Sequence, residues 1–357
     1  MKYLPENLYH LPGNLLSWYD GCARVLPWRD DPTAYHVWVS EIMLQQTRVS
    51  AVLPYYQRFL EALPDVKSLA QVDEEKLLKL WEGLGYYNRA RNLQKAARVI
   101  METYGGTFPD TYDEILKLPG IGDYTAGAVA SIAFGRCVPA VDGNVLRVIA
   151  RITGDEGDIL DTKVKARFRE WLVEIQPQNR PGDFNQALME LGAMVCVPNG
   201  APHCEACPSH SFCRAYLENS WMKIPVKKKK APRRKEYKTV FVLLSADGVA
   251  LRKRAENGLL AGLWEFPNVE GTLDEAAAAA QLACWGITPV EWKQQLKAKH
   301  IFTHVEWHML GYVLRVKGHG LESFAWTTQA MRAERAVPSA FVKFTDAADA
   351  YFLKEDE

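Results

Sequence analysis

Several marks of a membrane or secreted protein are missing from this sequence. None of its apolar runs approaches the roughly 20 residues that a membrane-spanning helix needs. The stretch 1–13 has neither a basic start nor an apolar core, so it does not look like a signal peptide, and we expect a cytoplasmic protein without a membrane partner. No internal repeat is visible. The 43 basic and 43 acidic residues cancel, so net charge neither favours nor excludes a nucleic-acid partner.

Cysteine is scarce, with seven residues in 357, and it is unevenly placed. Three cysteines are isolated, whereas the other four fall within residues 196–213. Their spacing is C-x7-C-x2-C-x5-C, and in a cytoplasmic chain such a cluster favours a metal centre over disulfides. Thiolates suit both zinc and iron–sulfur clusters, and spacing alone does not separate them. The predicted metal ligands are Cys196, Cys204, Cys207 and Cys213.

The chain is long enough for two domains, and its texture changes in the middle. Residues 1–222 repeat apolar positions every three or four residues, which predicts an almost entirely helical domain. The stretch 223–238 holds nine Lys or Arg and two Pro, so 223–237 is predicted to be a basic linker that could also lie along phosphates.

The part after the linker, residues 238–345, is predicted to be a mixed α+β domain. Two strands are expected around the turn at 246–248, and further strands in "FTHVEWHMLGYVLRV" and in "FVKF", which ends at residue 344. "TLDEAAAAAQLACW" predicts a helix, and 346–357 is expected to be a frayed acidic tail. The predicted fold class is therefore a two-domain α+β protein whose first domain is all α.

The segment "LPGIGDYTAG", residues 118–127, has two glycines between two apolar helical runs. This predicts a helix, a tight hairpin and a second helix within residues 112–133. Gly120 and Gly122 allow the sharp turn, and the amides of such a turn beside a helix start can hold a phosphate oxygen. The hairpin is therefore a candidate grip on a nucleic-acid backbone.

Two carboxylates stand out in their surroundings. Glu41 lies in the apolar run "VWVSEIMLQQT", where burial would raise its pKa, although an exposed Glu on an amphipathic helix is an equally good interpretation. Asp142 in "VDGNV" precedes a helical run, and taken alone it is an ordinary helix cap.

These motifs occur together in one order that resembles the helix–hairpin–helix DNA glycosylases with an iron–sulfur cluster. "LPWR", "SEIMLQQT" and "GLGYYNRARNL" are similar to the MutY family within that group, and "GLLAGLWEFP" and "FTH" resemble its Nudix-like C-terminal domain. The resemblance implies a [4Fe–4S] cluster, although this chain has seven residues where the family has six after the first cysteine. It also implies a monomer of bacterial type, associated with the nucleoid, that removes adenine from A:8-oxoguanine and A:G mispairs in double-stranded DNA.

The resemblance also implies catalytic roles. Glu41 would protonate N7 of an extruded adenine, while Asp142 would stabilise the oxocarbenium ion or bond to it transiently. Tyr124 would assist this pair, and Asn144 would orient Asp142 and water. Relatives that nick the strand have a lysine where Tyr124 stands, so we expect a monofunctional enzyme that leaves an abasic site.

Further positions match family residues around the base and the duplex. The implied adenine pocket consists of Arg24, Leu44, Gln186 and Trp28. The implied DNA contacts are Gln46, Thr47, Leu84, Tyr86, Gly120 and Gly122, with Tyr86 as an aromatic stacking platform.

The C-terminal domain is expected to recognise the damaged base through Phe302, Thr303 and His304. Its helix offers Asp274 and Glu275 and then five alanines, too few carboxylates for the magnesium site of a Nudix hydrolase. Two alternatives stay open: an endonuclease III-like glycosylase with lyase activity, which Tyr124 argues against, and a non-catalytic binder of distorted DNA, which the intact Glu41 and Asp142 argue against.

Overall fold

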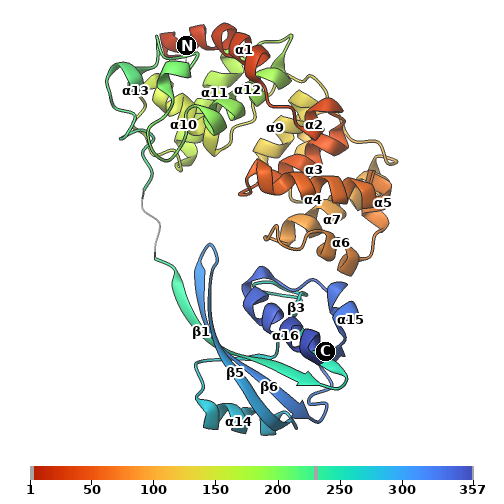
Figure 1. The fold of residues 1–357 in the computed structure, drawn as a ribbon. Coiled ribbons are helices and arrows are strands. Elements are labelled where there is room, and N and C mark those ends of the chain that lie inside the picture. The colour runs from red at the N-terminus through yellow and green to blue at the C-terminus, as the bar shows by residue number, and fades with distance from the viewer. Residues whose placement is uncertain (1–3, 229–231, 356–357) are drawn as a thin grey trace. The chain divides into compact units, whose positions relative to one another are not determined.

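The computed structural model describes residues 4–228 and 232–355, and its contacts divide the chain into two compact units (Figure 1). The first unit consists of residues 1–71 and 92–229, and the second of 72–91 and 230–357. The prediction placed 72–91 with the helical domain, whereas the division by contacts groups this segment with the second unit. Residues 229–231 of the predicted linker lie outside the described residues. In the described part of the chain, no helix is long and apolar enough to cross a membrane.

The first unit is helical, as its apolar periodicity predicts. Residue 142 and Thr111 cap their helices through side-chain oxygens, and α7 ends at Thr103, just before Gly105 and Gly106 with positive φ. Its elements are η1 (Glu6–His10), α1 (Leu11–Cys22), α2 (Pro27–Asp30), α3 (Ala34–Leu44), α4 (Val49–Ala62), α5 (Val66–Gln71), α7 (Asn88–Thr103), α8 (Tyr112–Leu116), α9 (Asp123–Ile132), α10 (Gly143–Thr153), α11 (Thr162–Ile175), α12 (Pro181–Met194), η2 (Cys204–Ala206) and α13 (Arg214–Leu217).

Helices α10 and α12 lie at the centre of this unit. Helix α12 packs against α1, α9 and α10, and α3 packs against α9. The approach of α12 to α10 is close because residue 192 is glycine: a Cβ there would lie 2.6 Å from Cβ of Asn144. These contacts bring the first turns of α9 and α10 near the buried face of α3.

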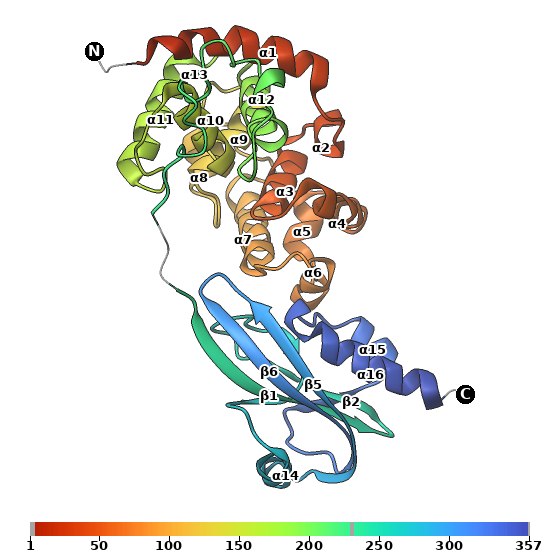
Figure 2. The same cartoon turned by 60° about the vertical axis from the view of Figure 1, so that its left-hand side comes forward.

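The second unit is a mixed sheet with helices on both faces (Figure 2). The strand order is β3-β2-β1-β6-β5, with β4 on β1 and β7 on β2, and β1 and β6 are parallel. Its elements are α6 (Glu74–Leu80), β1 (Arg234–Ser245), β2 (Gly248–Lys253), β3 (Trp264–Glu265), β4 (Asn268–Glu270), α14 (Glu275–Cys284), β5 (Thr288–Ile301), β6 (Val305–Lys317), β7 (Phe324–Thr327), α15 (Gln329–Ala333), η3 (Ser339–Phe341) and α16 (Val342–Glu355).

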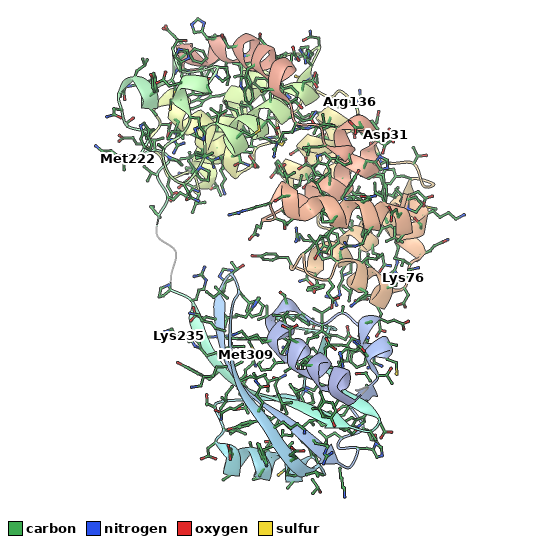
Figure 3. All side chains as sticks on the ribbon, in the orientation of Figure 1. Asp31, Lys76, Arg136, Met222, Lys235 and Met309 are labelled. Carbon is green, nitrogen blue, oxygen red and sulfur yellow. The ribbon has the colours of Figure 1, made fainter. Side chains whose placement is uncertain are left out.

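Each face of this sheet has its own core. Helix α14 packs on the face that carries Phe241 and Leu314, and α16 packs on the face that carries Trp307 and Met309. Figure 3 labels Met309. The predicted strands at β1, β2 and β6 and the predicted helix α14 are confirmed. Strand β5, in contrast, is absent from the prediction.

Two expectations at the C-terminal end are wrong. "FVKF" is not a strand, because it forms the end of η3 and the start of α16. Phe341 and Phe344 are three residues apart, so they share one helical face and are both fully buried. The expected frayed tail from residue 346 continues α16 to Glu355 instead, and Ala348 is buried in the same core.

Candidate active site

Glu41 lies on α3 and is buried, with 5% of the residue exposed. Its neighbours from Val37 to Met43 are buried as well, so α3 has no polar face here and the alternative of an exposed Glu does not hold. Burial raises the pKa of Glu41 to about 7. The Tyr124 hydroxyl donates a hydrogen bond to Oε2 of Glu41 and, with Arg29, acts to lower this pKa, whereas the charge of Asp142 acts to raise it.

Asp142 is the N-cap of α10, so the ordinary cap interpretation is correct as far as it goes. Its Oδ1 accepts a hydrogen bond from the Val145 amide at 2.8 Å, and its Oδ2 accepts one from Nδ2 of Asn144 at 2.8 Å. Burial raises the pKa of Asp142, and these hydrogen bonds oppose that rise. The hydrogen bonds therefore favour the ionised carboxylate inside a site that otherwise disfavours charge.

Tyr124 lies in the first turn of α9. The charges of both carboxyl groups, Glu41 and Asp142, act on its hydroxyl. Its hydroxyl is 3.5 Å from Sδ of Met189, and burial and the charges of Glu41 and Asp142 raise its pKa well above the usual value. The phenol therefore stays neutral and acts as a donor. The structure thus brings three of the predicted catalytic residues into mutual interaction.

A partly buried ion-pair network, centred on the buried Glu190, lies next to this group. Nε and Nη2 of Arg24 donate to Oε1 and Oε2 of Glu190 at 2.6 and 2.7 Å, and Nη2 of Arg29 donates to Oε2 at 3.0 Å. Nε of Arg29 donates to Oε1 of Gln186 at 2.9 Å. Arg24 and Gln186 are among the residues predicted for the adenine pocket, whereas Arg29 and Glu190 are not. Glu190 could have been found by the same signal as Glu41, since it stands alone in the apolar run "ALMELGAMV".

The other two residues expected at the adenine pocket are placed differently from one another. Trp28 is buried and packs edge-on against Tyr56, with ring centroids 5.2 Å apart. Leu44 is the last residue of α3 and is half-buried. Trp28 therefore forms part of the core beside the site, and Leu44 lies at the end of the helix that carries Glu41.

The hairpin between α8 and α9 depends on one of its two glycines more than on the other. Gly120 has a φ of 75°, and a Cβ there would lie 2.4 Å from Cβ of Asn92. Gly122 has an ordinary φ of −106° and caps α9 with open space around it.

Two predicted DNA contacts lie just after the end of α3. Gln46 is exposed and has a φ of 58°, while the Thr47 amide donates to the Leu44 carbonyl.

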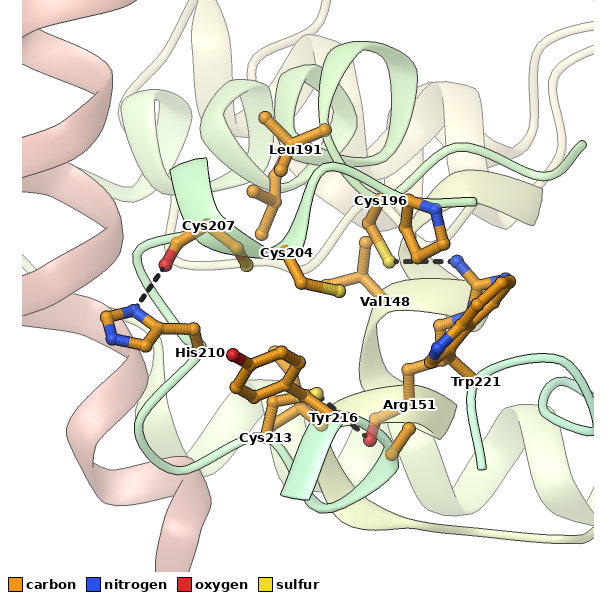
Figure 4. A pocket seen from close by; sticks show the side chains of 14 residues that line it. Val148, Arg151, Leu191, Cys196, Cys204, Cys207, His210, Cys213, Tyr216 and Trp221 are labelled. Carbon is orange, nitrogen blue, oxygen red and sulfur yellow. Dashed lines mark hydrogen bonds between the residues drawn. The ribbon is translucent and has the colours of Figure 1, made fainter. Parts of the chain in front are cut away.

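All four clustered cysteines line one pocket (Figure 4). Nη1 of Arg151 donates to Sγ of Cys196 at 3.3 Å, and Cys213 donates to the carbonyl of Arg151 at 3.4 Å. Burial raises the pKa of the Cys207 thiol to about 12 and that of Cys213 to about 11. In the part of the chain that is described, no three His, Cys, Asp or Glu side chains converge as a site for a metal ion.

One arginine connects this pocket to the catalytic group. Nη2 of Arg147 donates to Oδ1 of Asn144 at 2.9 Å and to the Gly192 carbonyl at 2.7 Å, and its Nε donates to the Cys196 carbonyl at 2.8 Å. Asn144 in turn donates to Asp142. Two side chains, Arg147 and Asn144, therefore link the cysteine loop to Asp142 through hydrogen bonds.

Comparison with known proteins identifies the family. Residues 39–174 match the HhH-GPD superfamily of base excision DNA repair proteins, and residues 239–347 match the NUDIX domain. The adenine DNA glycosylase of Mus musculus is 39% identical over 82% of this chain and 68% of the mouse protein, and that of Homo sapiens is 38% identical over 86% and 67%.

The chain belongs to the adenine DNA glycosylase family. A solved thermostable thymine-DNA glycosylase is similar to the chain with a TM-score of 0.55 and 30% identity, over 60% of this chain and 98% of that one. An endonuclease III–DNA complex has a TM-score of 0.50 at 24% identity over 59% and 97%, and it supports the helical fold alone. The predicted fold class, with its helix–hairpin–helix domain and Nudix-like C-terminal domain, is confirmed.

The glycosylase's second unit contains the predicted recognition residues at the turn between β5 and β6. Phe302 packs edge-on against Trp307, with centroids 4.8 Å apart, and its amide donates to the Val305 carbonyl at 2.8 Å. Thr303 and His304 are exposed. Phe302 therefore anchors the turn on the core, and the two polar residues project from it.

Two other predicted DNA contacts lie in the segment 72–91 of the same unit. Leu84 is buried, whereas Tyr86 is 49% exposed and has a φ of 49°. The Tyr86 hydroxyl and Oγ1 of Thr303 are hydrogen-bonded at 2.8 Å. The structure thus joins a predicted stacking residue to the predicted recognition turn, a pairing that sequence spacing could not reveal because 217 positions separate them.

Proposed function

We propose that this glycosylase hydrolyses the N-glycosidic bond of adenine mispaired with 8-oxoguanine or guanine and leaves an abasic site. The observation that carries the proposal is the buried Glu41, which has a pKa of about 7 and interacts with a second buried carboxyl group, Asp142, whose hydrogen bonds favour its ionised form. A carboxyl group with a pKa near the operating pH is suited to general acid catalysis. Adenine is proposed as the excised base because the mouse and human relatives are named adenine DNA glycosylases.

The proposed reaction divides the work between the two carboxyl groups. Glu41 gives its proton to N7 of the extruded adenine, the bond from N9 to C1′ breaks, and its electron pair leaves with the base. Asp142 then faces the positive charge on the sugar, which it stabilises electrostatically or by a transient bond. Water adds to C1′ and its proton is released, which completes hydrolysis. Asn144 keeps the carboxylate of Asp142 aimed through its 2.8 Å hydrogen bond.

The absence of an amine at position 124 supports a monofunctional reaction. A lyase of the endonuclease III type needs a lysine that forms a Schiff base with the sugar. Position 124 is a tyrosine whose phenol stays neutral and donates to Glu41. Burying two carboxyl groups close together costs free energy, and a non-catalytic DNA binder would gain nothing that offsets this cost.

The turn at 302–304 is proposed to read the base opposite the adenine. Thr303 and His304 are exposed donors and acceptors on a turn that Phe302 fixes to the core. Gly120 and its hairpin, with Gln46, Thr47 and Tyr86, are proposed to hold the duplex while the adenine is extruded. The second unit is not proposed to act as a Nudix hydrolase. The carboxylate of Asp274, one of its two candidate magnesium ligands, caps α14 by accepting a hydrogen bond from the Ala277 amide at 2.9 Å.

The four cysteines are proposed to hold a [4Fe–4S] cluster. The proposal is supported by the pocket that all four line, where Arg151 donates to a sulfur and would offset the charge of thiolates. Such a cluster would fix the loop 196–213 against α10. The extra residue between Cys196 and Cys204 lies in the loop before η2. Iron and sulfide analysis distinguishes this proposal from a zinc site.

The cellular setting is also a proposal. A monomer in the cytoplasm, associated with the nucleoid, suits a repair enzyme that acts on double-stranded DNA. Gel filtration with light scattering tests the monomer, and fluorescence microscopy of a tagged chain tests the location.

The decisive experiment is single-turnover base release from duplexes with A opposite 8-oxoguanine, G or T, scored before and after alkali. We expect release from the two mispairs, fastest opposite 8-oxoguanine, and strand breaks only after alkali. Breaks without alkali that track with base release would favour the lyase alternative. Tight binding without any release would favour the non-catalytic binder.

A further inference from the structure

Glu190 is a buried carboxylate that the proposed reaction does not use. It lies on α12, and only 1% of its side chain is exposed. Both of its oxygens accept hydrogen bonds from guanidinium groups, at 2.6 and 2.7 Å from Arg24 and at 3.0 Å from Arg29. These two cations hold its pKa below the usual value although burial acts in the opposite direction. Glu190 is therefore a fixed negative charge inside the site.

Arg29 is oriented through three acceptors. Besides Glu190, its Nε donates to Oε1 of Gln186 at 2.9 Å and its Nη1 donates to the Arg24 carbonyl at 2.9 Å. Because a guanidinium group is planar and its donors point in fixed directions, holding one edge sets the others. The carbonyl oxygen of Gln186 is thus occupied by Arg29, and its NH2 group is left to donate to a bound base.

Arg29 also acts on the general acid through space. The groups that face Glu41 are Tyr124 from α9, Asp142 from the start of α10 and Arg29 from α2. The positive charge of Arg29 favours the ionised form of Glu41, in which it could not donate a proton. A negative partner in contact with Arg29 weakens that effect, because the opposite electrostatic effects of the two charges on the more distant Glu41 largely cancel.

We propose that Glu190 is a positioning residue of the excision site, which fixes Arg29 and through it the Gln186 amide, and which balances the charge of Arg29 beside Glu41. This inference rests on the proposed role of Glu41 as general acid. Glu190 itself would touch neither the adenine nor the sugar. It would act on the rate through Gln186 and on the pH dependence through Arg29.

The test is the pH profile of single-turnover adenine release by the full-length, iron-loaded protein. Glu190→Gln keeps the shape of the side chain and removes its charge. The unbalanced Arg29 then favours ionised Glu41, so the basic limb of the profile should move to lower pH by about half a unit to one unit. Release well below that limb should also fall by about tenfold, because Gln186 is less well oriented.

Three further variants keep the test decisive. Arg29→Gln removes the positive charge, so its basic limb should move to higher pH, and the double variant should bring the limb back toward the wild-type position. Glu190→Asp keeps the charge on a shorter side chain, so it should restore the limb more than the rate. Asp183→Asn is the matched control: Asp183 is on the same helix and pairs with Arg180 at 2.7 Å, but it is 41% exposed and should leave the profile unchanged.

The outcomes separate this inference from the proposed function. A Glu190→Gln variant that is folded and slower by the same factor at every pH would overturn it, because Glu190 would then be a structural residue only. If Glu190→Gln does not fold, an unshifted limb in Arg29→Gln would overturn it equally. A wild-type profile with no basic limb would instead contradict Glu41 as the general acid, before any variant is compared.

Discussion

The proposed excision site, around Glu41 and Asp142, and the proposed recognition turn at residues 302–304 are built in opposite ways. The excision site is buried, and its catalytic side chains are held by hydrogen bonds from α3, α9 and α10. The recognition turn presents Thr303 and His304 to solvent, with Phe302 as its anchor. Chemistry on a bond needs charges that are already in place and shielded from water. Reading a base needs polar groups that a partner can reach.

This contrast predicts different failures in the two regions. A change in the excision site should alter the rate or the pH dependence on every substrate. A change at the recognition turn should alter the ratio between substrates and leave the chemistry intact. The predictions below follow that contrast from the largest expected effect to the smallest.

Asp142→Asn should abolish adenine release, by about a thousandfold or more, while mispair binding is retained. Asparagine can still cap α10, so the fold should survive, but it cannot face the oxocarbenium ion as an anion. Single-turnover kinetics measure the effect. Asp161→Asn is the matched control, because Asp161 caps α11 through the Lys163 amide at 2.7 Å without touching the site. Equal losses in both variants would show that only capping matters.

Glu41→Gln should stabilise the protein and inactivate it at neutral pH. Because the folded pKa of Glu41 is raised to about 7, its contribution to stability is present below its unfolded pKa and is lost as pH rises through 7. The gain from Gln should therefore grow between about pH 5 and pH 8, by on the order of 2–3 kcal/mol. Urea unfolding at both pH values measures it. A gain that does not change with pH would contradict the raised pKa.

Thr303→Ala combined with His304→Ala should reduce the preference for 8-oxoguanine over guanine by about tenfold. The rate on A:G should stay near that of wild type, because neither residue lies in the excision site. The ratio of single-turnover rates on the two duplexes is the measurement. An unchanged ratio would remove the turn from the recognition of the lesion.

Arg233→Gln should reduce the same preference only about two- to threefold. Nε of Arg233 donates to the Phe302 carbonyl at 3.1 Å, and the Arg234 amide donates to the His304 carbonyl at 3.1 Å, so the start of β1 steadies the turn. The salt dependence of binding separates this role from a phosphate contact. Weaker binding to every duplex with a shallower salt slope would indicate a lost phosphate contact instead.

The sequence predicts most of the helical unit because its signals are local. Apolar periodicity acts within a few residues, and the helices that it predicts are confirmed. The Thr111 cap and the two glycines at 105 and 106, which follow the end of α7, are equally local. The sequence left Glu41 open between a buried and an exposed position, and the structure shows that it is buried among apolar neighbours on α3. These features follow from residues that are adjacent in the chain.

Features that depend on distant partners were not predictable in the same way. Strand β5 was missed because it is the edge of the sheet, where few residues are buried and the alternation of apolar positions is lost. "FVKF" has the composition of a strand, and only its packing against the sheet makes it helical. The ion pairs of Glu190 join residues more than 160 positions apart.

The absence of a side chain at Gly192 matters for the interpretation of genetic variants. A methyl group at this position would collide with Asn144, and the Gly192 carbonyl also binds Arg147. The same helix carries Gln186 and Glu190, so moving it outward would shift both sides of the site together. A carrier of Gly192→Ala should therefore have the mutation spectrum of a carrier without the enzyme, although the altered residue is buried between two helices.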